Sequence, residues 1–182
     1  MDQTSNKIIS SETHFEGKVF NVRTDRVLLD LGFETNIDIV EHKPAVSIVP
    51  IDEKDRLIMV RQYRHPSLRQ LLEIPAGIIE DGEDPEETAL RELQEETGFS
   101  SKNLRLMTGF WSSPGFTNEY MYAFIAKDLL ESKLPQDEDE DISVEKIPLD
   151  QVERLIKFGE IEDAKSIACI MMAKFLFSKS KT

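Results

Sequence analysis

Three glutamates follow an arginine within one short stretch of the chain. Glu92, Glu95 and Glu96 come directly after Arg91 at spacings of i, i+3 and i+4, so on a helix their carboxylates would share one face. Like charges at these spacings oppose a helix by roughly 0.2–0.5 kcal/mol per pair, so a cation is needed to offset them. Mg²⁺ suits this role because it prefers carboxylate oxygens and accepts phosphate oxygens as further ligands. The stretch predicts metal-assisted phosphate chemistry.

A solvated acidic helix face is the alternative, and a lone run of glutamates would favour it. In this chain Gly77, Glu83 and Gly98 also stand at set distances from the glutamates. At ordinary residue frequencies, such a set arises by chance at a given start on the order of 10⁻⁸ of the time. The spacing therefore disfavours the solvated face.

The segment from Gly77 to Phe99 resembles the Nudix box, G-x5-E-x7-R-E-U-x-E-E-x-G-U with U an aliphatic or aromatic residue, and every position matches. The resemblance implies an α/β (α+β) Nudix fold, in which a mixed β-sheet is sandwiched between helices. It also implies Mg²⁺-dependent cleavage of a nucleoside diphosphate linked to another group. The box identifies the superfamily and leaves the substrate open.

The same resemblance assigns roles to residues in and before the box. Glu83 would lie at the edge of the metal site, and Arg91 would brace the loop by pairing with a carboxylate, which makes it a candidate catalytic residue. The implied metal ligands are the carbonyl of Ala76 and the side chains of Glu92, Glu95, Glu96 and Glu140.

Two further motifs resemble the ADP-ribose pyrophosphatase branch. One is Ser113-Pro114-Gly115 with an acid four residues on, for which an ordinary Pro-Gly turn is the alternative. The other is Arg61-Gln62-Tyr63-Arg64, where the planar fork of Arg64 suits phosphate oxygens unless it is a surface arginine without a specific contact. The candidate substrate-binding residues are Arg61, Arg64, Gly115, Phe116 and Glu119.

An acidic run at residues 137–141 precedes an expected strand. Such runs are typical of solvated or disordered loops. In the resembling branch, however, a mobile loop at this place brings acids to the metal, which implies Glu138 as general base and Glu140 as a ligand. Glu95 is the alternative base. We favour Glu138, because a metal-bound carboxylate has a lowered pKa and is a poor base.

The resemblance implies hydrolysis of nucleoside diphosphate sugars by a metal-activated water. ADP-ribose is the favoured substrate, giving AMP and ribose 5-phosphate, and GDP-mannose or another sugar nucleotide is the alternative. Two or three Mg²⁺ ions are expected, with Mn²⁺ able to substitute. A Nudix module that senses a nucleotide without cleaving it is an alternative of another class. It would be expected to lack some of the metal glutamates, all of which are present here.

Composition limits the partners and the location. The net charge of −13 argues against nucleic acid. The single cysteine, Cys169, excludes an internal disulfide and fits a reducing compartment, and the N-terminus lacks a secretory leader, so we expect a cytoplasmic protein. The apolar run around Cys169 is too short to span a membrane.

The elements that must position these residues follow from periodicity and from turn residues. We expect an N-terminal antiparallel β-segment at residues 1–43, with a turn near Gly32, and a Nudix catalytic domain at residues 44–182. In the resembling branch such N-terminal segments pair two copies, so a homodimer is expected. Residues 45–51 and 56–63 would form a hairpin, and further strands are expected at about 71–75, 104–112, 118–126 and 142–148.

Three helices are expected. The first begins at Pro85 after the N-cap Asp84 and ends at Gly98. The second starts after Asp150, with Glu153 completing a capping box. The third begins near residue 163 and has an apolar face made of Ile167, Ile170, Met171 and Phe175, interrupted by Lys174.

Overall fold

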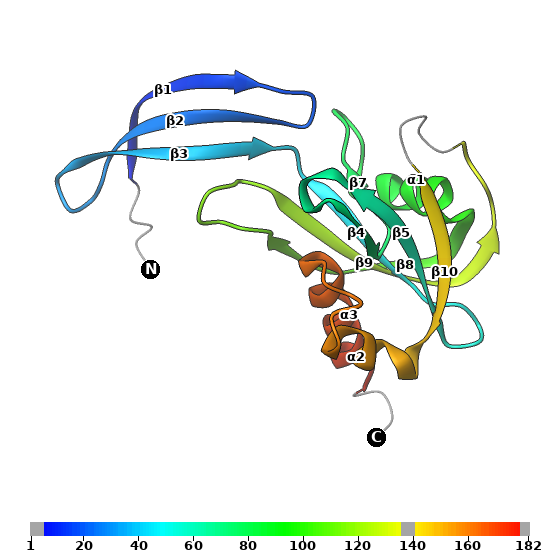
Figure 1. Ribbon diagram of the computed structural model, residues 1–182. Helices are drawn as coiled ribbons and strands as arrows, with labels where there is room; N and C mark the ends of the chain where they lie inside the picture. Colours follow the sequence, from blue (N-terminus) through cyan, green and yellow to red (C-terminus); the bar gives the residue numbers. More distant parts are fainter. Residues whose placement is uncertain (1–5, 136–140, 179–182) are drawn as a thin grey trace. The chain divides into compact units, whose positions relative to one another are not determined.

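The computed structural model describes residues 6–135 and 141–178 (Figure 1). The chain divides into two compact units. The N-terminal unit comprises the residues up to Pro44 together with Trp111–Tyr120, a segment that the sequence placed in the catalytic domain. The core unit comprises Ala45–Phe110 and the residues from Met121 onward.

The N-terminal unit is built on a three-stranded antiparallel sheet of β1 (Lys7–Glu16), β2 (Phe20–Leu28) and β3 (Glu34–His42), in that order. The expected turn at Gly32 is present, and its φ of 85° is a conformation that glycine adopts without strain. The segment 111–120 is fixed to β3 because the Val40 N–H donates to the Phe116 carbonyl at 2.8 Å. The predicted N-terminal antiparallel β-segment is therefore confirmed.

The core unit contains two sheets. The mixed four-stranded sheet has the order β7 (Ala76–Ile78), β4 (Ala45–Pro50), β9 (Tyr120–Glu131), β8 (Phe99–Trp111), with β4 parallel to β9 and antiparallel to β7. The antiparallel three-stranded sheet has the order β10 (Ile142–Pro148), β5 (Arg56–Arg64), β6 (Arg69–Glu73).

The predicted hairpin between residues 45–51 and 56–63 is wrong. β4 and β5 lie in different sheets and are joined only by a bridge between Ile51 and Leu57 and by the turn that links Asp52 to Asp55. The reason is that β4 is buried along its whole length and already pairs with β7 on one side and β9 on the other. It has no open edge for β5.

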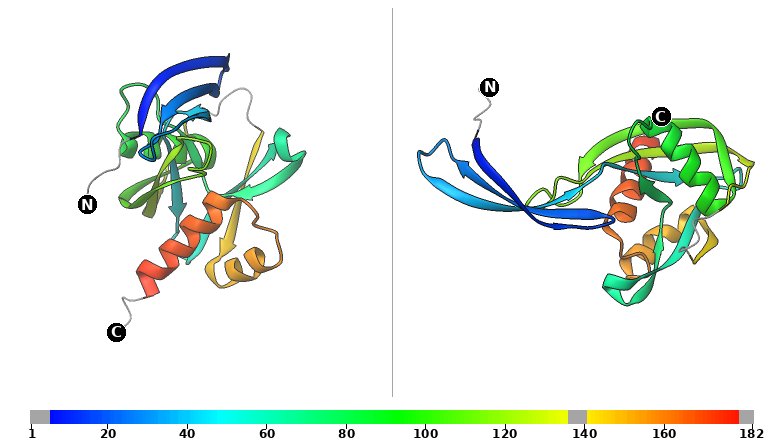
Figure 2. Two further views of the ribbon diagram at one scale, coloured as in Figure 1. Left: turned by 90° about the vertical axis from the view of Figure 1, so that its left-hand side faces the viewer. Right: turned by 90° about the horizontal axis from the view of Figure 1, so that it is seen from above.

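Helices cover both faces of the four-stranded sheet. Along β4, Val46 and Ile48 pack with Leu93 of α1 (Pro85–Thr97), whereas Val49 packs with Cys169 of α3 (Ala164–Ser178) and with residues of α2 (Leu149–Lys157). Figure 2 shows α1, in green, and α3, in orange, on different sides of the core strands. Because side chains alternate along a strand, β4 contributes side chains to the hydrophobic layers on both faces of the sheet. The expected sheet sandwiched between helices is confirmed.

The helix ends agree with the sequence for α1 and differ for α2. Asp84 caps α1 by accepting from the Glu86 N–H at 2.8 Å, and Gly98 ends it with a φ of 75°. α2 begins at Leu149, so the predicted capping box at Asp150 is wrong. The Leu149 N–H instead donates to the carbonyl of Asp55 at 3.0 Å, so a neighbouring turn supplies what a capping side chain would have supplied.

The predicted apolar face of α3 is displaced around the helix. Its buried side chains are Ser166, Cys169, Ile170 and Ala173. Met171 and Phe175 are exposed, whereas the Ser166 hydroxyl accepts from the Ile74 N–H and the Cys169 thiol lies 3.3 Å from the Ser47 hydroxyl. Among the residues that the structure describes, no helix is both long and apolar enough to cross a membrane.

Candidate active site around Arg91 and the carboxylates of α1

One guanidinium group, on α1, bonds two carboxylates of the same helix and one of the loop that precedes it. Arg91 Nη1 donates to Glu92 at 2.7 Å and to Glu95 at 2.9 Å. Its Nε and Nη2 grip both carboxylate oxygens of Glu83 at 3.1 and 3.0 Å, and Nη2 also reaches the Ile78 carbonyl at 3.3 Å. We call Arg91, Glu83, Glu92 and Glu95 the Arg91 cluster. It ties the helix to the loop that carries Glu83.

The electrostatics of the Arg91 cluster keep its members charged. The bond from Arg91, helped by the Glu80 N–H and the Thr88 hydroxyl, lowers the pKa of Glu83 from its ordinary 4.5 to about 2. Partial burial opposes the charge of Arg91, but its bonds to the glutamates outweigh this and raise its pKa. One cation therefore faces three anions, and negative charge remains in excess.

Gly77 leaves room for the carboxyl group of Glu92. A β-carbon built on Gly77 would overlap this carboxyl group, so a larger residue would displace the Glu92 side chain from its place against β7. The sequence marked Gly77 as a fixed position but gave no reason for it. The reason is the close approach of a predicted metal ligand.

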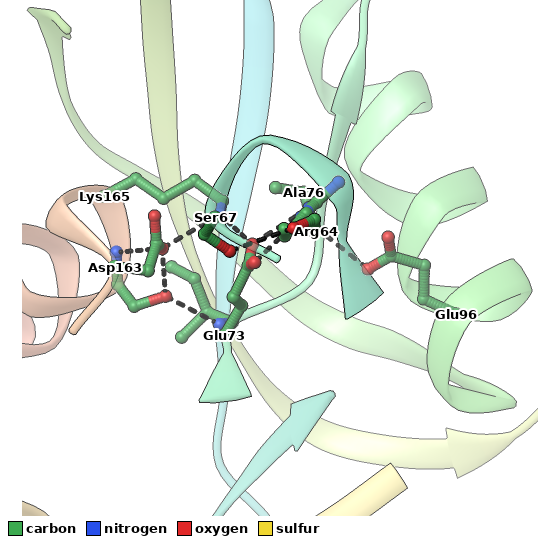
Figure 3. A network of polar contacts seen from close by, with 9 residues as sticks. Arg64, Ser67, Glu73, Ala76, Glu96, Asp163 and Lys165 are labelled. Atoms are coloured by element: carbon green, nitrogen blue, oxygen red, sulfur yellow. Dashed lines mark hydrogen bonds and ion pairs between the residues drawn. The ribbon is translucent and has the colours of Figure 1, made fainter. Parts of the chain in front are cut away.

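Glu96 connects α1 to the backbone of β7. Its side chain is 3% exposed, and its Oε2 accepts a hydrogen bond from the Ala76 N–H at 3.1 Å (Figure 3). Two predicted ligands, the Ala76 carbonyl and the Glu96 carboxylate, thus belong to residues that contact each other directly.

The donor types at this site fit a hard divalent cation. Glu92, Glu95, Glu96 and the Ala76 carbonyl all offer oxygen, which Mg²⁺ prefers. In the described part of the chain, no three acidic, histidine or cysteine side chains are arranged together so as to hold an ion. In this structure Arg91 neutralises part of the negative charge of Glu83, Glu92 and Glu95.

Two predicted acids, Glu138 and Glu140, lie outside the described residues. The described chain resumes at Asp141, and Ile142 pairs with Gln62 on β5. The acidic run therefore ends beside the strand that carries both predicted phosphate-binding arginines.

Those two arginines form ion pairs within the three-stranded sheet. Arg61 Nε donates to Glu145 on β10. Arg64 uses Nε and Nη2 to grip Glu73 in a fork, at 2.8 and 2.9 Å. The Arg64 side chain is still 40% exposed, and its third nitrogen, Nη1, is not part of this fork.

Glu73 has a second cationic partner that the sequence did not reveal. Lys165 of α3 donates to it, and Lys165 Nζ also lies 2.9 Å from Asp163 (Figure 3). Burial, which leaves Glu73 only 2% exposed, raises its pKa, but Arg64 and Lys165 outweigh this effect and hold the pKa below its ordinary value. We call Arg64, Glu73, Lys165 and Asp163 the Glu73 cluster.

The remaining substrate-binding candidates lie in the N-terminal unit. Residues 113–117 form a turn, in which the Phe116 N–H donates to the Ser113 carbonyl at 3.1 Å, and the Phe116 side chain is exposed. Glu119 lies 3.6 Å from the His42 ring. Gly115 lies in the same turn, whereas Arg61 and Arg64 belong to the core unit.

Comparisons with known proteins agree on one family. The NUDIX domain family matches residues 41–168. The chain is 41% identical to an ADP-ribose pyrophosphatase of Bacillus subtilis, with 93% of each chain covered, and 38% identical to a methanol dehydrogenase activator of Bacillus methanolicus, with 90% of each covered. A crystal structure of an ADP compounds hydrolase superposes over the whole of both chains with a TM-score of 0.88 at 25% identity.

Proposed function

Because this chain belongs to the Nudix family, we propose that it hydrolyses nucleoside diphosphate sugars at the diphosphate, with ADP-ribose as the preferred substrate. The products are then AMP and ribose 5-phosphate. The observation that carries the proposal is the complete box, in which Arg91 forms ion pairs with Glu83, Glu92 and Glu95. The similarity to an ADP-ribose pyrophosphatase over nearly the full length supports the choice of substrate.

The metal ligands proposed for this site are Glu92, Glu95, Glu96, Glu140 and the carbonyl of Ala76. Their all-oxygen character favours Mg²⁺, with Mn²⁺ as a substitute, and we propose two or three ions. When bound, such ions would neutralise the diphosphate and lower the pKa of a water. Glu138 would be the general base, and Glu95 is the alternative base.

The chain's own residues hold the site and the substrate. Arg91 braces the Glu83 loop against α1 through bonds of 3.0 and 3.1 Å, and it is a catalytic residue in the sense that it holds the reacting carboxylates. Arg61 and Arg64 bind phosphate oxygens of the substrate. Gly115, Phe116 and Glu119 contribute contacts to the rest of the nucleotide sugar.

We also propose a homodimer in the cytoplasm. The N-terminal unit exposes large apolar side chains along its strands and turns, which a second copy would cover: Ile8, Phe15, Val19, Leu31 and Phe33. The partner molecule is a nucleoside diphosphate sugar. The net charge of −13 does not suit nucleic acid.

The test is release of monophosphate from ADP-ribose, ADP-glucose, GDP-mannose, UDP-glucose and NADH with Mg²⁺. It is run beside Glu96→Gln and beside Glu87→Gln, a matched change at an exposed position of the same helix. We expect turnover that Glu96→Gln abolishes and Glu87→Gln preserves.

The ranking within the panel decides the substrate. GDP-mannose above ADP-ribose would replace the favoured substrate by its main rival. Tight nucleotide binding without turnover of any compound would reject the enzyme in favour of a nucleotide-sensing module.

A further inference from the structure

The four residues from the last of β6, Glu73, to the first of β7, Ala76, are each held by other parts of the core unit. Glu73 is held by two cations, and the Ile74 N–H donates to Ser166 Oγ at 2.9 Å. The Pro75 carbonyl accepts from the Ile48 N–H at 2.9 Å, and the Ala76 N–H donates to Glu96 at 3.1 Å. Each residue from Glu73 to Ala76 is therefore held by at least one hydrogen bond or ion pair.

The first turn of α3 supplies two of these attachments. One oxygen of Asp163 accepts from the Ser166 backbone N–H at 3.0 Å, from the Ser166 hydroxyl at 2.6 Å and from Lys165 Nζ at 2.9 Å. Asp163 thus caps the helix and also orients both side chains toward the segment. Ser166 is fully buried, so its hydroxyl is available only to these partners.

The charges of the Glu73 cluster explain why Lys165 is needed. Glu73 is almost fully buried, and a lone buried carboxylate is costly unless cations and hydrogen bonds surround it. Arg64 bonds both oxygens of the Glu73 carboxylate, and Lys165 is a second cation that bonds Oε2. Lys165 is thus bonded to the same carboxylate oxygen as Arg64 Nη2, and it restrains the carboxylate against which the 40% exposed Arg64 side chain is oriented.

We propose that Lys165 is a positioning residue for this reaction: through Glu73, it holds the guanidinium of Arg64 in the orientation in which Nη1 meets the substrate diphosphate. Lys165 does not itself touch the substrate. The role rests on the proposed function, because it needs Arg64 to bind phosphate. A misplacement of about 1 Å at such a group is enough to cost affinity or rate.

The test compares Lys165→Met with Lys174→Met. Lys174 lies on the same helix and also forms an ion pair, with Glu153, but both members of that pair are exposed. For each variant we would measure kcat and KM for ADP-ribose with Mg²⁺, and the Kd of a non-hydrolysable ADP-ribose with a methylene-bridged diphosphate.

We expect Lys165→Met to raise KM and the analogue Kd by about tenfold, with kcat changed by less than about threefold, because a phosphate contact made equally in the ground and transition states acts on KM. Lys165→Arg, which keeps the charge, should restore most of the affinity. In an Arg64→Met background, Lys165→Met should raise KM no further, since its effect passes through Arg64.

The proposal is overturned if Lys165→Met behaves like Lys174→Met, if it lowers kcat at unchanged KM, or if its effect is undiminished in Arg64→Met. Should circular dichroism show that Lys165→Met does not fold, Lys165→Gln, which keeps a donor for Glu73, takes its place under the same criteria. If the wild-type protein cleaves no sugar nucleotide, only the proposed function is rejected. The analogue Kd would still decide the role of Lys165.

Discussion

Two clusters of the core unit both combine cationic and acidic side chains but differ in charge balance. In the Arg91 cluster one guanidinium serves three glutamates, and in the Glu73 cluster two cations serve two acids. Glu83, Glu92 and Glu95 are partly exposed, whereas Glu73 is sealed. Excess carboxylate that faces solvent can accept a further cation, whereas a balanced buried network already has its counter-charges. The comparison teaches that charge balance, more than residue type, distinguishes the proposed metal site from the buried network beside it.

The most direct test of this difference is to neutralise one acid in each cluster. Glu92→Gln should lower kcat by about a thousandfold, because a lost metal ligand is worth several kcal/mol of transition-state stabilisation. Its thermal midpoint should stay level or rise, since a like charge is removed. Steady-state kinetics and calorimetry check both points, with Glu87→Gln as the control. A large loss of stability would place Glu92 with the framework.

Glu73→Gln should show the opposite pattern in stability. An amide cannot serve both Arg64 and Lys165, and removing one partner of a buried ion pair typically costs about 3 kcal/mol or more. Urea unfolding would measure the loss. A variant as stable as the wild type would show that the buried charges contribute little to the fold.

Arg91→Met should sharpen the contrast through its dependence on Mg²⁺. Without the guanidinium, Glu83, Glu92 and Glu95 lose their shared cation, so we expect a loss of about 1–3 kcal/mol in metal-free buffer. Mg²⁺ at 100 times its Kd would return about 2.7 kcal/mol. Because Arg91 no longer competes with Mg²⁺ for these carboxylates, the variant should have the lower Kd, so at one fixed Mg²⁺ concentration its metal-dependent shift in thermal unfolding should exceed that of the wild type. Equal shifts would contradict an excess of acid at this site.

The smallest expected effect is a pH dependence of stability that Glu83 causes. Its pKa falls from 4.5 to about 2 on folding, so its contribution is complete above pH 4.5 and is lost as the pH falls toward 2. After solvent screening at this partly exposed site, we expect about 1–2 kcal/mol across that window. Urea unfolding of the wild type and Glu83→Gln at several pH values checks this. The two profiles should converge at the acid end, and parallel profiles would contradict the assignment.

The sequence was most informative where local rules act. The Pro85 and Gly98 signals placed α1 almost to the residue, since a proline after a capping acid and a left-handed glycine each have one local meaning. Helical spacing accounts for the contact of Arg91 with Glu95, which lies one turn further along α1. The role of Arg91 in bracing the loop by pairing with a carboxylate came from the resemblance to the box.

The sequence was least informative where the partner is distant. Nothing in the neighbourhood of Glu73 or Lys165 indicates that they bond, since 92 residues separate them. Distant residues also decided two other features. β7 and β9 pair with β4, so the predicted hairpin with β5 does not form, and the Asp55 carbonyl accepts from the first N–H of α2, where a capping side chain was predicted. The hydrogen bond from the Ile74 N–H to Ser166 on the inward face of α3 was likewise not indicated by the apolar stripe of the helix.

The buried thiol of Cys169 makes this protein convenient for site-directed labelling. Cys169 is the single cysteine of the chain, it is sealed between α3 and β4, and burial raises its pKa, so little reactive thiolate forms at neutral pH. A cysteine introduced at an exposed position, such as Leu31 of the N-terminal unit or Phe158 of the core unit, would therefore be the thiol that a maleimide or nitroxide reagent finds. Fluorescence or spin-label distances could then follow the two units during turnover without prior removal of the native cysteine.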